Sequence, residues 1–199
     1  MIKLHVSLGN RKLGKIPSVS FPPVMTCKPS APCFKACYAM KAYRQYPNVR
    51  TALTDNLELW RTDPKAFKAQ FWQWLEKHKP AYFRYHVSGD IPDYSYFIFM
   101  LMTAIAFPDI QFLAYTKRDD ILTELPNTLF GLPKNLTLRQ SIWLNESRSL
   151  PLPVAGVRDN QGNISNMPTD VRYTFICGGS CVNCKQCWSR EHSILFDMH

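Results

Sequence analysis

Four cysteines lie within eleven residues near the end of the chain, and no other feature constrains the fold as strongly. They are Cys177, Cys181, Cys184 and Cys187. Each ligand of a metal centre must bring a thiolate to one small volume, and a short loop with closely spaced cysteines does this. Consecutive two-residue gaps resemble the ferredoxin run that binds a [4Fe–4S] cluster. A compact four-cysteine zinc site, disulfide bonds and free thiols are the alternatives.

The composition indicates a globular protein in a reducing compartment. The chain has 199 residues, 46% of them hydrophobic, so we expect one α/β domain over residues 1–199 with a cysteine-rich segment at 177–199. Residues 1–15 lack the apolar segment of a signal peptide, and no apolar run reaches transmembrane length. We therefore expect a cytoplasmic protein without membrane contact, in which clustered thiols stay reduced and bind metal.

The charge of the chain permits a nucleic-acid partner without indicating one. The formal net charge is +9 and the isoelectric point is about 9.3. If all seven cysteines bind metal as thiolates, the net charge of the protein falls to +2, so much of the basic excess offsets ligand charge. The basic residues form no long run, which leaves nucleic acid as one candidate partner.

A second cysteine group lies near the start of the chain. Cys27, Cys33 and Cys37 are separated by gaps of five and three residues. Three protein ligands leave one position of a cluster open for a small molecule, or one position of a zinc ion open for water. In the alternative interpretation, this group and the C-terminal run share one zinc ion or cluster, and the spare cysteines are buried as small apolar residues.

The pattern along the chain predicts strands that alternate with helices. Helices are expected from Asn48 and from Asp63, and a further helix from Pro92 to Ala106. Alternation of this kind argues for a parallel sheet with right-handed crossovers, here a partial (β/α)6 TIM-barrel-like sheet with cysteine-rich loops at its C-terminal rim. The six expected strands lie within Val19–Thr26, Tyr82–Val87, Ile110–Thr116, Leu136–Ser141, Val154–Val157 and Val171–Ile176.

Polar residues follow the expected strands at the edge where parallel α/β folds build their sites. His86 is a candidate proton carrier or ligand, or a polar residue covered by a loop. Asp90 is a candidate site carboxylate or the cap of the following helix. Lys117 and Arg139 are candidates for holding an anion at this rim. We take His86, Asp90 and Lys117 as the candidate catalytic residues.

Several segments together resemble a known family of phage and plasmid proteins, called gene product 88. They are Cys27 to Ala39 with its three cysteines, Tyr46 to Leu59, His86-Val-Ser-Gly-Asp90, Ala114-Tyr-Thr-Lys117 and the closing cysteine run. Their order and spacing match over about residues 15–190. The family has no assigned reaction, so the resemblance implies a mobile-element origin and little about chemistry.

A more distant resemblance is to radical S-adenosylmethionine enzymes. That family has a three-cysteine loop after the first strand of a partial barrel, and a Gly-Gly-Glu segment after the second strand that binds the cofactor. Here Cys27, Cys33 and Cys37 would be the cluster ligands, and Ser88, Gly89 and Asp90 the cofactor-binding segment. The spacing of these three cysteines departs from the usual gaps of that family.

These observations lead to two functional hypotheses. In the first, the chain is a [4Fe–4S] metalloprotein of mobile-element origin and a redox or radical enzyme, with one or two clusters and with S-adenosylmethionine as a candidate cofactor. In the second, it is a non-catalytic protein in which zinc or an iron–sulfur cluster stabilises a basic surface that binds nucleic acid or a host protein.

Overall fold

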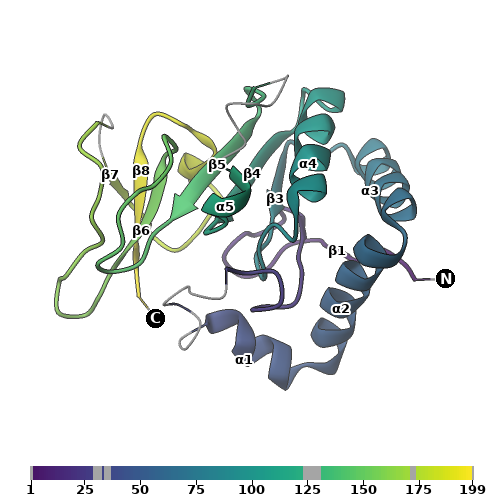
Figure 1. The fold of residues 1–199 in the computed structure, drawn as a ribbon, viewed down its shortest axis with the longest axis horizontal. Coiled ribbons are helices and arrows are strands. Elements are labelled where there is room, and N and C mark those ends of the chain that lie inside the picture. Colours follow the sequence, from purple (N-terminus) through teal and green to yellow (C-terminus); the bar gives the residue numbers. More distant parts are fainter. Residues whose placement is uncertain (1, 29–32, 34–36, 123–130, 171–173, 199) are drawn as a thin grey trace.

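The computed structural model describes residues 2–28, 33, 37–122, 131–170 and 174–198. They form a mixed α/β protein around one sheet of eight strands in the order β1-β2-β3-β4-β5-β6-β8-β7 (Figure 1). Strands β1 and β2 pair antiparallel, and every other neighbouring pair is parallel. The sheet is open, with β1 and β7 at its edges, so it does not close into a barrel.

Strands β3, β4, β5, β6 and β7 lie where the sequence predicted strands, and the other three differ from the prediction. The first strand is confined to β2, because Pro22 and Pro23 follow closely and lack a backbone donor. The sequence did not predict β1 or β8, and β8 lies between β6 and β7. The strands are β1 Val6–Ser7, β2 Ser18–Val19, β3 Tyr82–Tyr85, β4 Gln111–Thr116, β5 Leu136–Ser141, β6 Val154–Arg158, β7 Thr174–Ile176 and β8 Ser193–Asp197.

Local signals start and stop the helices. Asp63 accepts a hydrogen bond from the Ala66 N–H (2.9 Å), and Asp93 accepts one from the Tyr96 N–H (2.8 Å), so each carboxylate caps a helix. None of the helices in the described ranges is both long enough and apolar enough to cross a membrane. The helices are α1 Tyr38–Gln45, α2 Pro47–Thr62, α3 Pro64–His78, α4 Tyr94–Ala106, α5 Asp119–Leu122 and the 3₁₀-helix η3 Gln186–Trp188.

One face of the sheet is covered by helices and packed with aromatic side chains. Figure 1 shows α3 and α4 beside β3 and β4. The rings of Phe71 and Phe83 meet edge to face with centroids 5.3 Å apart, a geometry that aromatic pairs prefer. The fully buried members of this core include Phe67, Phe71, Phe83, Tyr85, Phe97 and Phe112.

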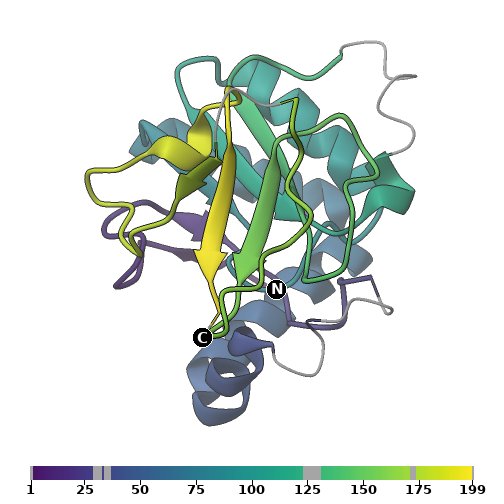
Figure 2. The same ribbon diagram turned by 90° about the vertical axis from the view of Figure 1, so that its left-hand side faces the viewer.

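The opposite face is covered by the cysteine run and by the N-terminal segment. Because β7 and β8 are parallel neighbours, residues 177–192 must cross the sheet from the end of β7 back to the start of β8. Figure 2 shows this crossover, in yellow, beside the purple N-terminal residues, and the Cys181 N–H donates to the Lys12 carbonyl (2.8 Å). A second, smaller apolar cluster lies here: Leu13, Ile16, Leu113, Cys181, Cys187, Trp188 and Ile194.

Candidate metal centre and polar edge

The crossover places its four cysteines against the helix-free face of the sheet. Cys181 and Cys187 are buried, and Cys177 and Cys184 are half-buried. The N–H of Gly179 donates to the sulfur of Cys177 (3.4 Å). Trp188 fixes the far end of the crossover, since its Nε1 donates to the carbonyl of Gln111 at the start of β4 (3.0 Å). The crossover therefore spans the sheet face, and only Cys177 directly follows a strand end.

Burial favours the protonated form of two of the crossover thiols, those of Cys181 and Cys187. Burial raises the pKa of Cys181, and the positive charges of Arg84 and Lys12 oppose this rise. Burial also raises the pKa of Cys187, while Tyr115 and Arg139 oppose it. Cations and hydrogen-bond donors thus already surround the sulfurs in a way that stabilises thiolates. A metal ion would complete the shift, because it displaces the thiol protons.

Arg139, on β5, holds the crossover in place and has no carboxylate partner among the described residues. Its side chain is fully buried and bonds only to backbone carbonyls, among them those of Cys187 (2.9 Å) and His192 (2.8 Å). The sequence led us to expect Arg139 as an anion-holding residue at the rim of the sheet. That predicted position is wrong. Arg139 lies two residues before the end of β5, and its side chain points into the sheet face that the crossover covers.

Arg84, on β3, is a second cation on this face without a carboxylate partner among the residues described. Its guanidinium lies over the Tyr115 ring, 4.6 Å from the centroid, and its Nε is buried without a hydrogen-bond partner. None of the ion pairs in the described ranges includes Arg84 or Arg139. A buried cation is costly unless an anion compensates it, and the acidic groups that these two arginines influence include Cys181, Cys187 and Tyr115.

The cysteines are not gathered into a finished coordination site. All seven are free thiols. Within the described part of the chain, no three or more His, Cys, Asp and Glu side chains are arranged closely enough to hold a metal ion. The donor types and their spacing fit a thiolate centre, and the charges around the crossover fit it as well. Closing the site requires the crossover to draw its sulfurs together.

The three-cysteine group begins beside the end of β3, since the Thr26 hydroxyl next to Cys27 accepts from the Asp90 N–H (2.8 Å). Cys37 immediately precedes α1. The cysteines that act electrostatically on Cys27 are Cys37 and Cys33, whereas those that act on Cys181 are Cys177 and Cys184. Burial raises the pKa of Cys27 to about 12, and the Asp90 carboxylate adds to the rise. The structure therefore presents two groups, which does not favour one centre shared by all seven cysteines.

Asp90 ties the ends of β3 and β4 to the turn that precedes Cys27. Its carboxylate accepts from the backbone N–H groups of Ile91 and Lys117, both at 2.8 Å, and its own N–H donates to the Thr26 hydroxyl (2.8 Å). Burial raises the pKa of Asp90 to about 6, although these N–H donors oppose the rise. Asp90 is not the cap of the next helix, since Asp93 has that role.

The residues before Asp90 serve the close packing of this corner. Gly89 has a positive φ of 74°, and a Cβ there would lie 2.8 Å from the Thr26 hydroxyl and 2.9 Å from the Phe21 Cβ. Glycine is therefore required at this position by the approach of the cysteine-bearing loop. The hydroxyl of Ser88 is buried and has no hydrogen-bond partner among the described residues. A cofactor-binding role for Ser88 and Gly89 stays a prediction.

His86 lies inside the aromatic core and away from the polar edge. It is 3% exposed and stacks on Phe21, with ring centroids 5.4 Å apart. Burial lowers the pKa of His86 to about 3, so its imidazole is neutral at pH 7. Neither ring nitrogen has a hydrogen-bond partner among the residues described. Of the candidate catalytic residues, Asp90 has the pKa better matched to proton transfer near neutral pH.

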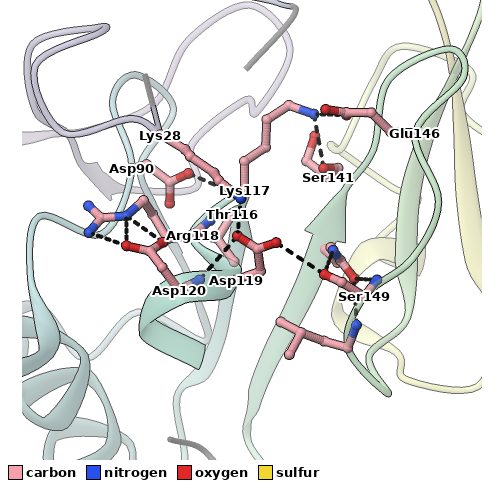
Figure 3. Close-up of polar contacts among 12 residues, drawn as sticks. Lys28, Asp90, Thr116, Lys117, Arg118, Asp119, Asp120, Ser141, Glu146 and Ser149 are labelled. Atoms are coloured by element: carbon pink, nitrogen blue, oxygen red, sulfur yellow. Dashed lines mark hydrogen bonds and ion pairs between the residues drawn. The ribbon is translucent and has the colours of Figure 1, made fainter. Parts of the chain in front are cut away.

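Lys117 reaches across a small polar pocket beside the three-cysteine group (Figure 3). Its ammonium donates to the Ser141 carbonyl (3.0 Å) and pairs with Glu146 (2.8 Å). On the opposite side, Lys28 pairs with Asp119 (2.6 Å). The cavity has a volume of about 180 Å³ and carries both signs of charge. Lys117 and Glu146 also act electrostatically on the Cys33 thiol.

Sequence reasoning missed four residues of these sites. Arg84 lay within a run of aromatic residues that predicted only a strand, although a cation at an inward position of a strand is itself a signal. Thr26 lay at the end of an expected strand, and Glu146 lay in a segment without periodicity. Arg118 was also missed: it pairs with Asp120 and donates to the carbonyls of Thr26 and Ile91, which fixes the turn before Cys27 (Figure 3).

Comparisons with known proteins give a family and nothing more specific. A family model described as gene product 88 matches residues 3–190. No curated protein and no solved structure matches the chain. The family match confirms the first resemblance seen in the sequence, and none of the comparisons supports the resemblance to radical S-adenosylmethionine enzymes.

Proposed function

The chain belongs to the gene product 88 family, and from this premise we propose that it is an iron–sulfur metalloprotein of phage or mobile-element origin. Cys177, Cys181, Cys184 and Cys187 hold a [4Fe–4S] cluster against the helix-free face of the sheet. Zinc bound by the same four thiolates is the alternative metal, and the experiment below separates the two.

The observation that carries this proposal is the pair of arginines behind the cysteines. Arg139 is fully buried and Arg84 is half-buried, and neither has a carboxylate partner in the described ranges. A [4Fe–4S]2+ core or a Zn²⁺ ion with four thiolates carries a net charge of about −2. That anion would compensate both guanidinium groups, whereas neutral thiols leave them uncompensated.

The surroundings of the crossover favour a centre that is shielded from water. Trp188 is buried on the sheet. Its ring centroid lies 5.4 Å from that of Tyr82, and the two ring planes meet at 77°. Burial of a cluster and hydrogen bonds to its sulfurs set its reduction potential. A bound cluster would supply one-electron transfer, and the protein's part is to hold it in a cationic, largely apolar setting.

The three-cysteine group is proposed as a second, open site. Cys27, Cys33 and Cys37 supply one ligand fewer than a closed centre needs, and Lys117 and Glu146, which line the polar pocket, act electrostatically on the Cys33 thiol. Asp90 is 5% exposed and both of its oxygens already accept hydrogen bonds. A small molecule at this site would therefore contact the pocket before it contacts Asp90.

The test is purification without oxygen, followed by iron, sulfide and zinc analysis and an absorbance spectrum. The proposal predicts a brown protein with a broad band near roughly 400 nm, typical of iron–sulfur charge transfer. Cys184→Ala should lose the band of the four-cysteine cluster, and Cys33→Ala should keep it. A colourless protein with zinc bound to the four cysteines would replace iron by zinc in this account, and a protein without metal would overturn it.

A separate test addresses the open site. S-adenosylmethionine, the cofactor suggested by the sequence, should change the electron paramagnetic resonance spectrum of the reduced protein if an iron at Cys27, Cys33 and Cys37 has a free position. Lys117→Gln should weaken this response and leave the iron content unchanged. No response from a protein with enough iron for two clusters would restrict the proposal to the four-cysteine centre.

A further inference from the structure

The net positive charge of the protein belongs to its first quarter. Residues 1–54 contain nine lysines and arginines and no aspartate or glutamate, whereas residues 55–199 contain fifteen of each sign and are neutral overall. The whole formal charge of +9 therefore lies in one continuous segment. A charge imbalance confined to one part of a chain is typical of a surface that meets a polyanion.

Part of this segment forms an exposed corner where α1 meets α2. Figure 1 shows α1 at the margin of the molecule, on the far side of the N-terminal loops from the sheet. Lys41, Arg44 and Arg50 are exposed there, and none of them joins an ion pair among the described residues. Cations without acidic neighbours keep their full attraction for an external anion.

The start of α2 adds backbone donors to this corner. Tyr46 is the N-cap residue of α2, its side chain makes no capping hydrogen bond, and no acidic residue lies in the first turn. The first N–H groups of a long helix are therefore left without a side-chain acceptor, beside Arg44 and Arg50. A helix N-terminus in a cationic setting suits a phosphate group.

Two tyrosines lie among these cations. Tyr38 is 62% exposed although its hydroxyl donates to the carbonyl of Val87, and Tyr46 is 49% exposed. The hydrogen bond holds the Tyr38 ring in place without covering it. Exposed aromatic rings between cations are the elements with which proteins bind unpaired bases, because every base has a face that can stack.

We infer that the corner formed by Tyr38, Lys41, Arg44, Tyr46 and Arg50 binds single-stranded nucleic acid. The cations and the α2 N-terminus contact phosphates, and the tyrosines stack on bases. An acidic protein would satisfy the cations and leave the rings without a function, and duplex DNA offers no unpaired bases. The surface leads directly into the three-cysteine group, since Cys37 immediately precedes α1. Nucleic-acid binding at this corner is inferred from observations separate from those that support the metal centre.

The experiment is fluorescence anisotropy with the full-length protein and a labelled oligothymidylate of about 16 nucleotides, measured over a series of salt concentrations. The triple variant Lys41→Gln/Arg44→Gln/Arg50→Gln should weaken binding and lower the slope of log affinity against log salt by about 2, at roughly 0.7 for each phosphate contact. Tyr46→Leu should weaken binding about tenfold without changing the slope, and Tyr46→Phe should restore it. An oligouridylate tests whether RNA binds as well.

The matched control removes the same charge elsewhere. Arg61, Lys65 and Lys77 are exposed on α2 and α3, close in sequence to Glu58, Asp63 and Glu76. The variant Arg61→Gln/Lys65→Gln/Lys77→Gln should bind the oligonucleotide like the wild type. Equal weakening in both triple variants, equally tight binding of duplex DNA or heparin, or no binding at low salt would overturn the inference. Circular dichroism of each variant checks that α1 and α2 remain folded.

Discussion

The two faces of the sheet are stabilised in different ways. The face under α3 and α4 is an aromatic core in which Phe67, Phe71 and Phe83 are fully buried. The face under residues 177–192 is a thin layer of cysteines and a tryptophan over two arginines without carboxylate partners in the described part of the chain. Hydrophobic burial is sufficient for the first face. The second face needs an anion, which we assign to metal-bound thiolates.

This difference predicts that metal loss affects the faces unequally. Cys184→Ala should unfold the crossover or make the protein insoluble, because the free energy of binding a structural metal contributes directly to folding, by about 10–16 kcal/mol in zinc peptides. Cys33→Ala should cost much less, since its loop is proposed to serve an open site. Urea denaturation of both variants measures the difference. Equal losses would indicate one structural centre shared by both cysteine groups.

A cavity in the helix-covered face should lower the free energy of unfolding whether or not metal is bound. Phe71→Ala removes a fully buried ring that contacts Phe67, Phe83 and Phe99. We expect the free energy of unfolding to fall by about 3–5 kcal/mol, by the same amount before and after treatment with a chelator. A loss of stability that changes on chelation would show that the two faces are coupled and are not stabilised separately.

Asp90 lies where the two faces meet at the polar edge, and it should make stability depend on pH. Burial raises its pKa from 3.8 to about 6, so the folded state binds this proton more tightly than the unfolded state. Its contribution is fully present below about pH 4 and is lost as the pH rises to about 6, by on the order of 3 kcal/mol. Urea titrations of metal-free protein should show this slope, and Asp90→Asn should remove it. An unchanged slope in the variant would assign the effect to another group.

The smallest expected effect tests the cationic face most specifically. Arg84→Met removes a charge that has no carboxylate partner among the described residues, so the metal-free protein should be as stable as the wild type or more stable by about 1 kcal/mol. In the loaded protein the same change should weaken metal binding about tenfold, as outer-shell changes do. Arg84→Lys should behave like the wild type. Destabilisation of the metal-free protein would mean that Arg84 has a purely structural role.

The sequence predicted the helix-covered half of the fold better than the cysteine-covered half. Helix α4 and strand β4 carry strong local signals, namely a capping aspartate and apolar runs, and the predicted bounds of α4, β4 and β5 agree with the structure within about two residues. Strand β8 follows the cysteine run and contributes few residues, and its insertion between β6 and β7 depends on long-range pairing. Local periodicity does not encode that order, and the open sheet could not be foreseen from it.

The candidate site shows the same limit. The two cysteine groups could be read from spacing, and the polar residues Asp90 and Lys117 from their places after strands. The sequence could not show that His86 turns into the aromatic core with a φ of 57°, or that Arg139 and Arg84 lie behind the cysteines. These positions depend on which side of a strand faces the crossover, and that side is set by tertiary packing.

Hydrogen exchange of residues 177–192, compared with that of α3 and α4, tests the central claim most directly. The protein is purified without oxygen, and its amide protection is measured before and after removal of the metal with a chelator. We predict that the crossover is protected only in the loaded protein, while α3 and α4 keep their protection in both states. Equal protection of the crossover in the two states would contradict the claim that this face is held by metal-bound thiolates.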